Sequence, residues 1–452
     1  MFTTINPADE SVIERYPLTS SAAVDAALDA AVRAWSSWGL GPLEPRVGLL
    51  RRLAEALRSR RDPLSRLITA EMGKPVREAR AELDKCAATC LWYADHAAQL
   101  LAPRAIEVPD GAAQVIAEPL GPLLAIMPWN FPFWQVIRCA APAVALGNPV
   151  LLKHAPNTTG CALACAELFA AAGAPEGVFA TLVVEVDQVE GLIADPRVAA
   201  VTLTGSERAG SAVAAAAGRA IKPVVLELGG SDPFIVLADA DVDRALEVAV
   251  QARMMNSGQS CIAAKRIIVE APLYDRFVRR FAERVEALVC DDPAFESTQV
   301  GPLARRDLLE QFEQQVEATI GWGARCVTGG GRGRHPGFFF TPTVLAEVPE
   351  RAPAAREELF GPAAALWLAH DAEHALALAN DTSFGLGAAL WTRPERAPEL
   401  TRALRAGFVA VNGMVRSDAR VPFGGIRRSG VGRELGSEGL MAFANLKTVW
   451  TS

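Results

Sequence analysis

Histidine is scarce in this chain, and cysteine never occurs in the spacing of a metal site. The 452 residues hold five histidines, without clustering, and eight cysteines with no Cys-x-x-Cys pair. Metal centres usually draw on such groupings, so the sequence predicts no metal site. Two cysteine pairs have helical i, i+4 spacing, Cys86 with Cys90 and Cys161 with Cys165. We interpret them as small core residues in a protein from a reducing compartment, the cytoplasm.

Long apolar runs are also missing. No run approaches the roughly 18 residues that span a bilayer, because four prolines between residues 128 and 149 interrupt the most apolar region. Asp9 and Glu10 fall within the first ten residues, where no apolar core segment stands, which argues against a signal peptide. We therefore expect a soluble protein without a membrane partner.

An excess of positive charge is absent as well. The formal net charge is −7, which leaves no broad basic surface for nucleic acid. Residues 51–63 are locally basic, but Leu49, Leu50, Leu53 and Leu57 have helical spacing there, so a solvated helix face is the better interpretation. Hydrophobic residues make up 50% of the chain, enough for two or more sizeable cores.

Helical and strand-like segments alternate along most of the chain. Such a rhythm is expected of parallel sheets covered by helices, and a second alternation begins after Gly230. The sequence therefore predicts an α/β fold with two domains that meet near residues 227–230. The predicted helices cover residues 21–39, 78–100, 158–172, 208–217, 242–256, 273–289 and 303–320. The predicted strands cover residues 150–153, 178–184, 199–205, 223–228, 234–237, 266–270, 364–368, 388–392 and 408–412.

A candidate nucleophile, Cys261, lies in the string GQSCIAAKR, whose Gly, Gln and Ser before the cysteine are not a core pattern. A cysteine that opens a helix gains thiolate character from the helix N-terminus, and we expect this for Cys261. Glu227 stands 34 residues earlier, alone in an apolar strand. Burial raises the pKa of a carboxyl group toward that of a useful base. The alternatives are a core cysteine and a carboxylate paired with a Lys or Arg.

Three further strings suggest a binding site. In PWNFP two prolines stiffen the loop around Asn130, whose amide can donate to an oxyanion or, alternatively, cap a turn. In TLTGSERAG a strand runs through Gly205 and Ser206 into a helix, where a phosphate could bind; the string is not GxGxxG and is weak evidence alone. Arg138 lies in an apolar segment, where a substrate carboxylate or a structural ion pair would neutralise it.

In order and spacing these strings resemble the aldehyde dehydrogenase family, and within it the short succinate-semialdehyde dehydrogenases. The resemblance runs from INPAD at residues 5–9 to NLKTVW at 445–450. It is carried by EMGKP (71–75), PWNFPFWQVIR (128–138), LLKHAP (151–156), TLTGS (202–206), ELGG (227–230), GQSC (258–261), EELFGP (357–362) and PFGGIRRSGVGREL (422–435).

The resemblance implies an aldehyde dehydrogenase-like architecture. A Rossmann-type dinucleotide-binding domain would comprise residues 1–110 and 120–227, and an α/β catalytic domain residues 228–436. Residues 111–119 and 437–452 would form a small β bridging element that pairs sheets between subunits, so a homodimer or homotetramer is expected. Cys261 would be the nucleophile, Glu227 the base that activates the hydrolytic water, and Asn130 the oxyanion donor together with the backbone N–H of Cys261.

The resemblance also assigns a nicotinamide cofactor, NAD or NADP. Lys153 would bond the adenosine ribose, and Glu358 with Phe360 would hold the nicotinamide riboside. Pro156 departs from the family pattern, because NAD-preferring members often carry there a Glu that binds the ribose 2′-hydroxyl. Proline excludes neither cofactor, and Lys153 with His154 could favour NADP. The implied cofactor-binding set is Trp129, Lys153, Pro156, Gly205, Ser206, Leu228, Glu358 and Phe360.

The implied substrate is succinate semialdehyde, with its distal carboxylate on Arg138. Trp134 and Ser417 would line the same tunnel. Some semialdehyde enzymes carry a second Arg where this chain has Met255, which thins the expected carboxylate clamp. Oxidation of another small aldehyde, ester hydrolysis by the same thiol and a catalytically silent family member remain as alternatives, although a silent member would normally have lost one of the three catalytic residues.

Overall fold

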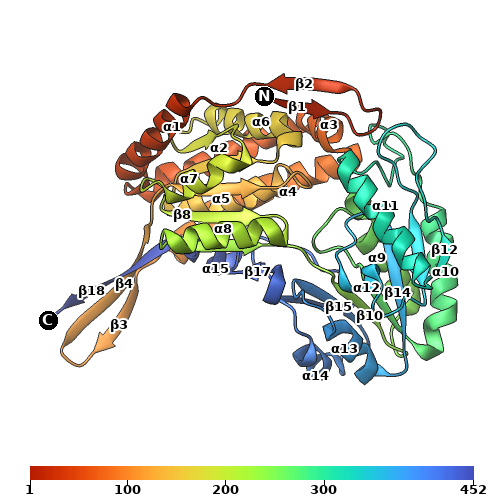
Figure 1. The fold of residues 1–452 in the computed structure, drawn as a ribbon. Helices are drawn as coiled ribbons and strands as arrows, with labels where there is room; N and C mark the ends of the chain where they lie inside the picture. Colours follow the sequence, from red (N-terminus) through yellow and green to blue (C-terminus); the bar gives the residue numbers. More distant parts are fainter.

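The computed structural model describes residues 1–452, which fold into two α/β halves and a protruding arm (Figure 1). The first half is built on a six-stranded sheet of order β17-β9-β8-β5-β6-β7, parallel except for β17, which pairs antiparallel with β9. Both faces of this sheet carry buried side chains, so its strands are nearly all apolar. Its strands are β5 (Leu123–Met127), β6 (Val150–His154), β7 (Phe179–Thr181), β8 (Ala200–Thr204), β9 (Val224–Glu227) and β17 (Gly430–Val431).

Helices cover both faces of the first sheet. The core on one face includes α2 (Leu43–Ser59), α4 (Val76–Leu100), α5 (Trp134–Leu146) and α6 (Thr159–Ala171). The core on the other includes α1 (Ser21–Ala34), α7 (Val189–Ala194) and α8 (Glu207–Arg219). The remaining elements of this half are β1 (Phe2–Ile5), β2 (Val12–Tyr16), α3 (Arg61–Met72), α15 (Gly436–Met441), a π-turn at Trp35–Gly39 and short 3-10 turns at Pro156–Thr158 and Val186–Gln188.

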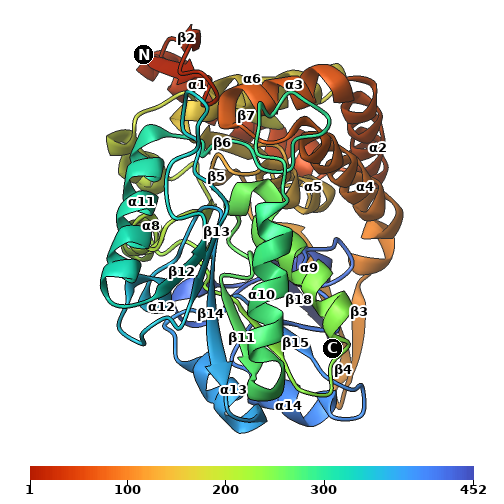
Figure 2. The ribbon, with the colours of Figure 1, turned by 90° about the vertical axis from the view of Figure 1, so that its right-hand side faces the viewer.

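The second half contains a seven-stranded sheet of order β12-β13-β14-β11-β10-β15-β16, in which only β12 runs antiparallel to its neighbour. Helices α9 and α10 pack on one face and α11 and α13 on the other (Figure 2). The strands are β10 (Pro233–Val236), β11 (Arg266–Glu270), β12 (Arg325–Thr328), β13 (Thr343–Ala346), β14 (Ala363–Ala369), β15 (Gly387–Trp391) and β16 (Phe408–Val411). The helices are α9 (Val242–Met254), α10 (Tyr274–Glu286), α11 (Arg306–Gly321), α12 (Pro353–Arg356), α13 (Ala372–Asn380) and α14 (Ala397–Ala403), with 3-10 turns at Met255–Gly258, Ala271–Leu273 and Arg427–Ser429.

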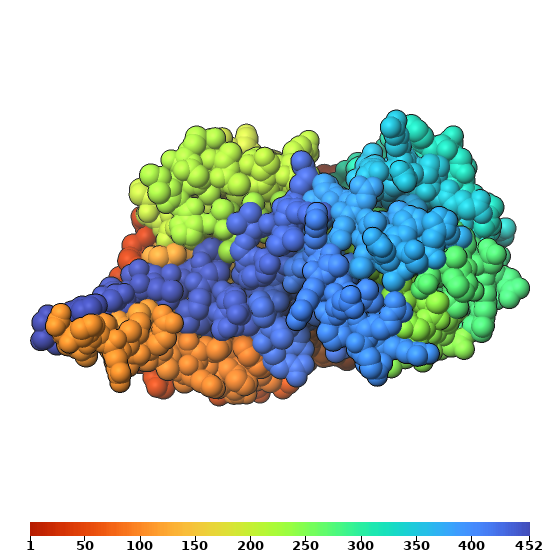
Figure 3. Space-filling view, turned by 90° about the horizontal axis from the view of Figure 1, so that it is seen from below, coloured from red at the N-terminus to blue at the C-terminus, as the bar shows by residue number.

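The arm is a three-stranded antiparallel sheet of order β18-β4-β3 that projects from the first half. It joins β3 (Arg104–Val108) and β4 (Gly111–Pro119) to β18 (Ala444–Thr451). In the space-filling view the C-terminal segment crosses the surface between the halves and ends on this arm (Figure 3). None of the helices combines the length and apolar character needed to cross a bilayer.

Every helix predicted from the sequence is present, with ends shifted by a few residues. The segment 21–39 ends in a π-turn rather than a regular helix, and strand 178–184 is cut to Phe179–Thr181. Several strands were not predicted, because short runs without turn signals resemble their surroundings, namely β1, β2, β3, β5, β12, β13 and β17. Gly430 and Val431 lie within the segment assigned to the catalytic domain but extend the first sheet through β9.

Candidate active site

The predicted catalytic loops meet where parallel strands of the first sheet end. Asn130 follows β5, Gly205 follows β8, and Glu227 is the last residue of β9. In the sheet β6 lies on one side of β5, and β8 lies on its other side. β5 and β8 therefore flank a topological switch point, where α/β sheets bind ligands. A cleft of about 700 Å³ opens there, between the two halves. Its lining includes the predicted residues Trp129, Asn130, Gly205, Ser206, Leu228, Cys261, Glu358 and Phe360.

The entrance to α8 is suited to a phosphate. Ser206 caps the helix by accepting from the N–H of Ala209 at 3.3 Å, and a Cβ added at Gly205 would meet only the side chain of Leu203. Free N–H groups and the positive end of the helix dipole therefore face open space. Glu207 in the first turn is itself paired with Arg428, so its charge is neutralised.

Lys153 and Pro156 lie at the end of β6, on the same edge of the sheet but outside the lining of the cleft. The Lys153 ammonium makes no hydrogen bond or ion pair, and burial lowers its pKa. His154 is buried, with Nε2 3.0 Å from the Pro132 carbonyl oxygen, and burial lowers its pKa to about 4. A lowered pKa disfavours a positive charge on His154, so Lys153 is the cation that this segment offers to a 2′-phosphate.

The loop that carries Cys261 is held in an unusual backbone conformation. Asn256 and Ser257 have φ of +56° and +55°, the left-handed region that costs energy for residues other than glycine. The Asn256 side-chain amide donates to the carbonyl oxygens of Asn130 at 2.8 Å and Gln259 at 3.0 Å. Gln259 in turn accepts from the N–H of Ala304 at 2.9 Å. These bonds fix the loop relative to the one that carries Asn130.

Asn130 points its amide nitrogen toward the cysteine loop. Its Nδ2 donates to the Gln259 carbonyl oxygen at 3.1 Å, which leaves the second N–H available, and Asn130 is buried. Gln259 precedes Cys261 by two residues. A donor fixed in this way matches the requirement for oxyanion stabilisation, a preorganised N–H next to the nucleophile.

Cys261 does not open a helix, and this corrects the expectation from the sequence. It lies in a turn after the 3-10 segment Met255–Gly258, and strand β11 follows. Burial raises the pKa of its thiol to about 12, while the positive charges of Arg138 and Lys265 act in the opposite direction. The thiol is therefore neutral at rest and needs a base before it can act as a nucleophile.

Glu227 is a carboxyl group in a nearly dry environment. It is 2% exposed, and neither of its oxygens has a hydrogen-bond partner. Burial raises its pKa well above the ordinary value; nearby Arg138 opposes the shift and nearby Glu434 adds to it. A Cβ at Gly424 would lie 2.6 Å from Glu227 Oε1, so the glycine leaves room for the carboxyl group. The predicted rise in pKa is confirmed in direction and cause.

Gly229, which lines the cleft, and Gly230 leave room for neighbouring groups. A Cβ at Gly229 would lie 2.4 Å from Glu358 Oε2, and one at Gly230 would lie 2.6 Å from the Cys261 carbonyl oxygen. Glu358 accepts from the N–H of Gly230 at 3.1 Å. Close by, the Phe360 ring packs edge-to-face on Trp129, with centroids 5.7 Å apart. The glycine pair therefore admits Glu358 to the cleft beside the nucleophile.

Lys265 connects Glu358 to the nucleophile loop. Its ammonium donates to the carbonyl oxygens of Ser260 at 2.7 Å and Cys261 at 2.8 Å, and lies 3.1 Å from Glu358 Oε1. Lys265 was not predicted from the sequence. Its position four residues after Cys261 could have marked it as a candidate site residue, since a cation so close in sequence can act on a thiol.

Sequence comparison decides the family. Residues 1–449 match the sequence model of the aldehyde dehydrogenase family. The chain belongs to the aldehyde dehydrogenase family.

Two relatives and two solved structures illustrate the similarity. The chain is 50% identical to a probable succinate-semialdehyde dehydrogenase [NADP(+)] of Synechocystis sp., over 99% of both chains. It is 47% identical to the succinate semialdehyde dehydrogenase [NAD(P)+] Sad of Escherichia coli, over 99% of this chain and 97% of the relative. The structure of succinic semialdehyde dehydrogenase from Streptococcus pyogenes with NADP+ superposes with a TM-score of 0.98 at 35% identity over the full length of both chains. That of the Burkholderia pseudomallei enzyme gives 0.96 at 34% identity, over 99% and 94% of the chains.

Arg138 of this aldehyde dehydrogenase is part of a buried ion pair. Its guanidinium is ion-paired with Glu434 and donates to the Thr204 hydroxyl at 2.9 Å, and both charged residues are buried. The Phe423 ring lies 5.3 Å from the guanidinium carbon. The structural ion pair, the alternative considered for Arg138, is what the structure shows. Glu434 could not be found as its partner because 296 residues separate the two in sequence.

Trp134 and Ser417, the other two expected substrate residues, do lie together, and a third residue joins them. The ammonium of Lys85 lies 2.7 Å from the Ser417 hydroxyl oxygen and 4.0 Å from the centroid of the Trp134 ring. Nothing in the sequence around Lys85 marks it, because it falls between core positions of a long helix.

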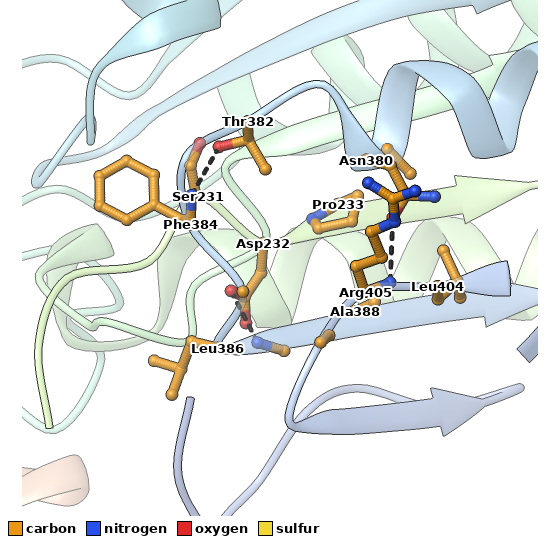
Figure 4. Close-up of a pocket in the computed structure, with 14 residues that line it drawn as sticks. Ser231, Asp232, Pro233, Asn380, Thr382, Phe384, Leu386, Ala388, Leu404 and Arg405 are labelled. Atoms are coloured by element: carbon orange, nitrogen blue, oxygen red, sulfur yellow. Dashed lines mark hydrogen bonds between the residues drawn. The ribbon is translucent and has the colours of Figure 1, made fainter. Parts of the chain in front are cut away.

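A second pocket of the aldehyde dehydrogenase, beside the buried Asp232, is too small for a substrate (Figure 4). Its volume of about 10 Å³ corresponds to a single water. Asp232 accepts there from the N–H of Gly387 at 3.0 Å, and burial raises its pKa to about 7. Asp232 therefore fixes the backbone between two strands of the second sheet and stands apart from the cleft.

Proposed function

We propose that this chain oxidises succinate semialdehyde to succinate with NADP+ or NAD+. The observation that carries the proposal is the meeting of three groups at one junction. Cys261 lines the cleft, the Asn130 amide is fixed beside it through Gln259, and Glu227 is an unpartnered buried carboxyl group at the end of the neighbouring strand. Succinate semialdehyde is proposed as the substrate because relatives at 44–50% identity, among them the Synechocystis and E. coli proteins, are succinate-semialdehyde dehydrogenases by name.

The residues of the cleft fit a dinucleotide cofactor, whose nicotinamide accepts the hydride when bound. The start of α8 offers N–H groups to a phosphate, and Trp129 and Phe360 form an aromatic wall. Leu228 adds an apolar contact on the floor of the cleft. Lys153 supplies an unpaired ammonium farther along the same sheet edge, where Pro156 brings no carboxylate that would repel a 2′-phosphate. Both NADP+ and NAD+ are therefore compatible with this edge.

The protein side of the chemistry follows from the charges. In its ionised form Glu227, whose raised pKa makes it a stronger base, takes the Cys261 proton and passes it to solvent, and the thiolate then attacks the aldehyde carbon. The oxyanion is held by the Asn130 amide and the Cys261 N–H. After oxidation to a thioester, Glu227 removes a proton from a water that attacks the carbonyl carbon, and Cys261 leaves as the thiol. The product is a carboxylic acid.

We further propose the division into a dinucleotide-binding part (1–110 and 120–227), a catalytic part (228–436) and a bridging part (111–119 and 437–452). The arm supports a homodimer or homotetramer, since β3 leaves an edge open to pairing. Four large apolar side chains of the arm are exposed, namely Ile106, Leu446, Val449 and Trp450. Eight free cysteines fit a reducing compartment, which supports a cytoplasmic location.

The test is a substrate panel with each cofactor. The purified protein is mixed with NAD+ or NADP+ and with succinate semialdehyde, butyraldehyde or benzaldehyde, and reduced cofactor is followed by absorbance. We expect the highest kcat/KM with succinate semialdehyde. No reduced cofactor with any aldehyde, together with hydrolysis of p-nitrophenyl acetate in its absence, would replace the dehydrogenase proposal by an esterase.

A further inference from the structure

Lys85 lies on α4 next to the beginning of α5. Glu82, one turn earlier on α4, accepts from the backbone N–H groups of Phe133 and Trp134, both at 2.9 Å. This contact fixes the first turn of α5 against α4 and brings the Trp134 ring to within 4.0 Å of the Lys85 ammonium. Ser417, on the loop after β16, closes the group with its hydroxyl. The Lys85 ammonium is therefore held by contacts from two other segments, α5 and the loop of Ser417.

The Lys85 ammonium lacks an anionic partner. An ammonium has three donors, yet its one hydrogen bond is to the neutral Ser417 hydroxyl, and no carboxylate oxygen lies within 4 Å. The two acids that act electrostatically on Lys85 already have partners, since Glu82 is paired with Lys74 and Asp418 with Arg420. Leaving a half-buried cation unpaired is costly unless a ligand completes its bonds. Burial, with repulsion from Arg138, lowers the Lys85 pKa to about 8, as expected of a cation without a counter-ion.

The position of Lys85 suits the far end of a short substrate. Trp134 is the first residue of α5, and Asn130 stands in the loop that leads directly into this helix. Gln135, the residue after Trp134, lines the cleft together with Asn130 and Cys261, so the start of α5 connects the Lys85 site with the cleft. Arg138, the other cation near this end, is already paired with Glu434.

We propose that Lys85, held between Trp134 and Ser417, binds the distal carboxylate of the substrate and sets a preference for short aldehydes that carry a terminal carboxylate. The role rests on the proposed aldehyde oxidation and names the group that selects its substrate. The carboxylate accepts from two free N–H groups of Lys85 and from the Ser417 hydroxyl, while the uncharged aldehyde end reaches Cys261.

The experiment measures selectivity in the full-length enzyme. Lys85→Met keeps the length and helix propensity of the side chain and removes its charge. We expect kcat/KM for succinate semialdehyde to fall about 10- to 100-fold, mainly through KM, because a charge-assisted bond made in both ground and transition states is lost. Butyraldehyde, of similar shape but uncharged, should change less than about threefold. The inhibition constant of the product succinate should rise in parallel with KM.

Three controls separate the possible outcomes. Lys85→Arg keeps the charge and should retain most of the preference, and Lys85→Gln serves as a second neutral variant if Lys85→Met does not fold. Lys222→Met removes an ammonium that bonds the carbonyl oxygens of Ile193 and Asp195 away from the cleft, and should leave the ratio of the two substrates unchanged. A wild-type preference that survives in both neutral variants overturns the role of Lys85 alone. A wild-type enzyme that oxidises both aldehydes equally overturns the substrate assignment and Lys85 together, and one that oxidises neither overturns the proposed function.

Discussion

Arg138 and Glu434 form a buried ion pair beside Glu227, and the Thr204 hydroxyl completes the bonds of the guanidinium. The pair is formed by residues from α5 and from the segment just after β17. Because Arg138 opposes the rise in the Glu227 pKa while Glu434 adds to it, the pair sets the electrostatic environment of the catalytic carboxyl group. Its loss should therefore affect stability and chemistry alike.

We expect Arg138→Leu to destabilise the protein by about 3–5 kcal/mol, because it leaves the Glu434 carboxylate buried without a partner. The pKa of Glu434, already raised by burial, then rises further. A carboxyl group whose pKa is raised in the folded protein is ionised more easily in the unfolded chain, so rising pH favours unfolding. The loss of stability should therefore be larger at pH 8 than at pH 5. Urea unfolding at both pH values measures this.

The same variant tests the ion-pair interpretation through its kinetics. If Arg138 serves structure and the Glu227 environment, Arg138→Leu should slow succinate semialdehyde and butyraldehyde oxidation by the same factor at pH 6.5, well below the Lys85 pKa of about 8, where Lys85 is charged with or without Arg138. Selective loss of succinate semialdehyde oxidation with unchanged urea unfolding would return Arg138 to the substrate site. Arg138→Leu/Glu434→Leu, which removes both charges, should recover part of the lost stability.

Cys261→Ala should abolish aldehyde oxidation and p-nitrophenyl ester hydrolysis together, because both reactions need the same thiolate. The matched control is Cys290→Ala, which changes a half-buried cysteine outside the cleft and should keep both activities. Activity is followed by reduced cofactor and by released nitrophenolate. Continued oxidation of an aldehyde by Cys261→Ala would show that another group is the nucleophile.

Glu227→Gln should separate hydride transfer from hydrolysis. If Glu227 chiefly activates the hydrolytic water, rapid mixing shows near-stoichiometric reduced cofactor, followed by turnover slowed by about 10²–10⁴-fold. Because burial raises the pKa of both Glu227 and the Cys261 thiol, the carboxyl group can also be needed to form the thiolate. A missing burst would then identify proton removal from Cys261 as its main role.

The preference for succinate semialdehyde over butyraldehyde should decline as pH rises through about 8, the pKa to which burial and Arg138 lower Lys85. Protonated Lys85 attracts the carboxylate and neutral Lys85 does not, so KM for succinate semialdehyde should increase above this pH. Cys86, Glu82 and Asp418 also act on Lys85, and all three raise its pKa. Because titration of the catalytic groups affects both substrates, the ratio of kcat/KM values isolates Lys85. A pH-dependent ratio that persists in Lys85→Met would contradict this assignment.

Pro156→Glu should shift the cofactor preference toward NAD+. A carboxylate there can accept from a ribose 2′-hydroxyl but repels a 2′-phosphate, and this repulsion should raise KM for NADP+ by roughly tenfold. KM for NAD+ should stay the same or fall, with kcat unchanged. Pro156→Ala is the control for loss of the ring. Equal changes for both cofactors would place residue 156 away from the adenosine ribose.

The sequence predicted the α/β layering because buried parallel strands and alanine-rich helices have distinct periodicities. It also located the groups at strand ends, since Asn130, Gly205 and Glu227 are marked by loop residues or by a lone charge in an apolar strand. What it missed depends on contacts between distant segments. Lys85 carries no local signal, and its role appears only when α4, α5 and the loop of Ser417 come together.

The two corrected expectations have the same origin. Arg138 was assigned to the substrate because a buried cation needs an anion, which is true, but the anion is Glu434 from the far end of the chain. Cys261 was expected to open a helix, whereas it lies in a turn that leads into β11. In both cases local chemistry was interpreted correctly and the partner or the following element was set by tertiary structure.

The arm has a consequence for how the chain folds. β4 receives its second partner from β18, and Lys447 and Glu118, which bond across this pair, lie 329 residues apart in sequence. Until the ribosome has made the second half, β3 and β4 can only form a lone two-stranded ribbon, which is marginally stable in water and has an open edge. Contacts of such long range form slowly. The arm therefore cannot be completed before residues 444–451 have been made, so assembly through it would be deferred until then.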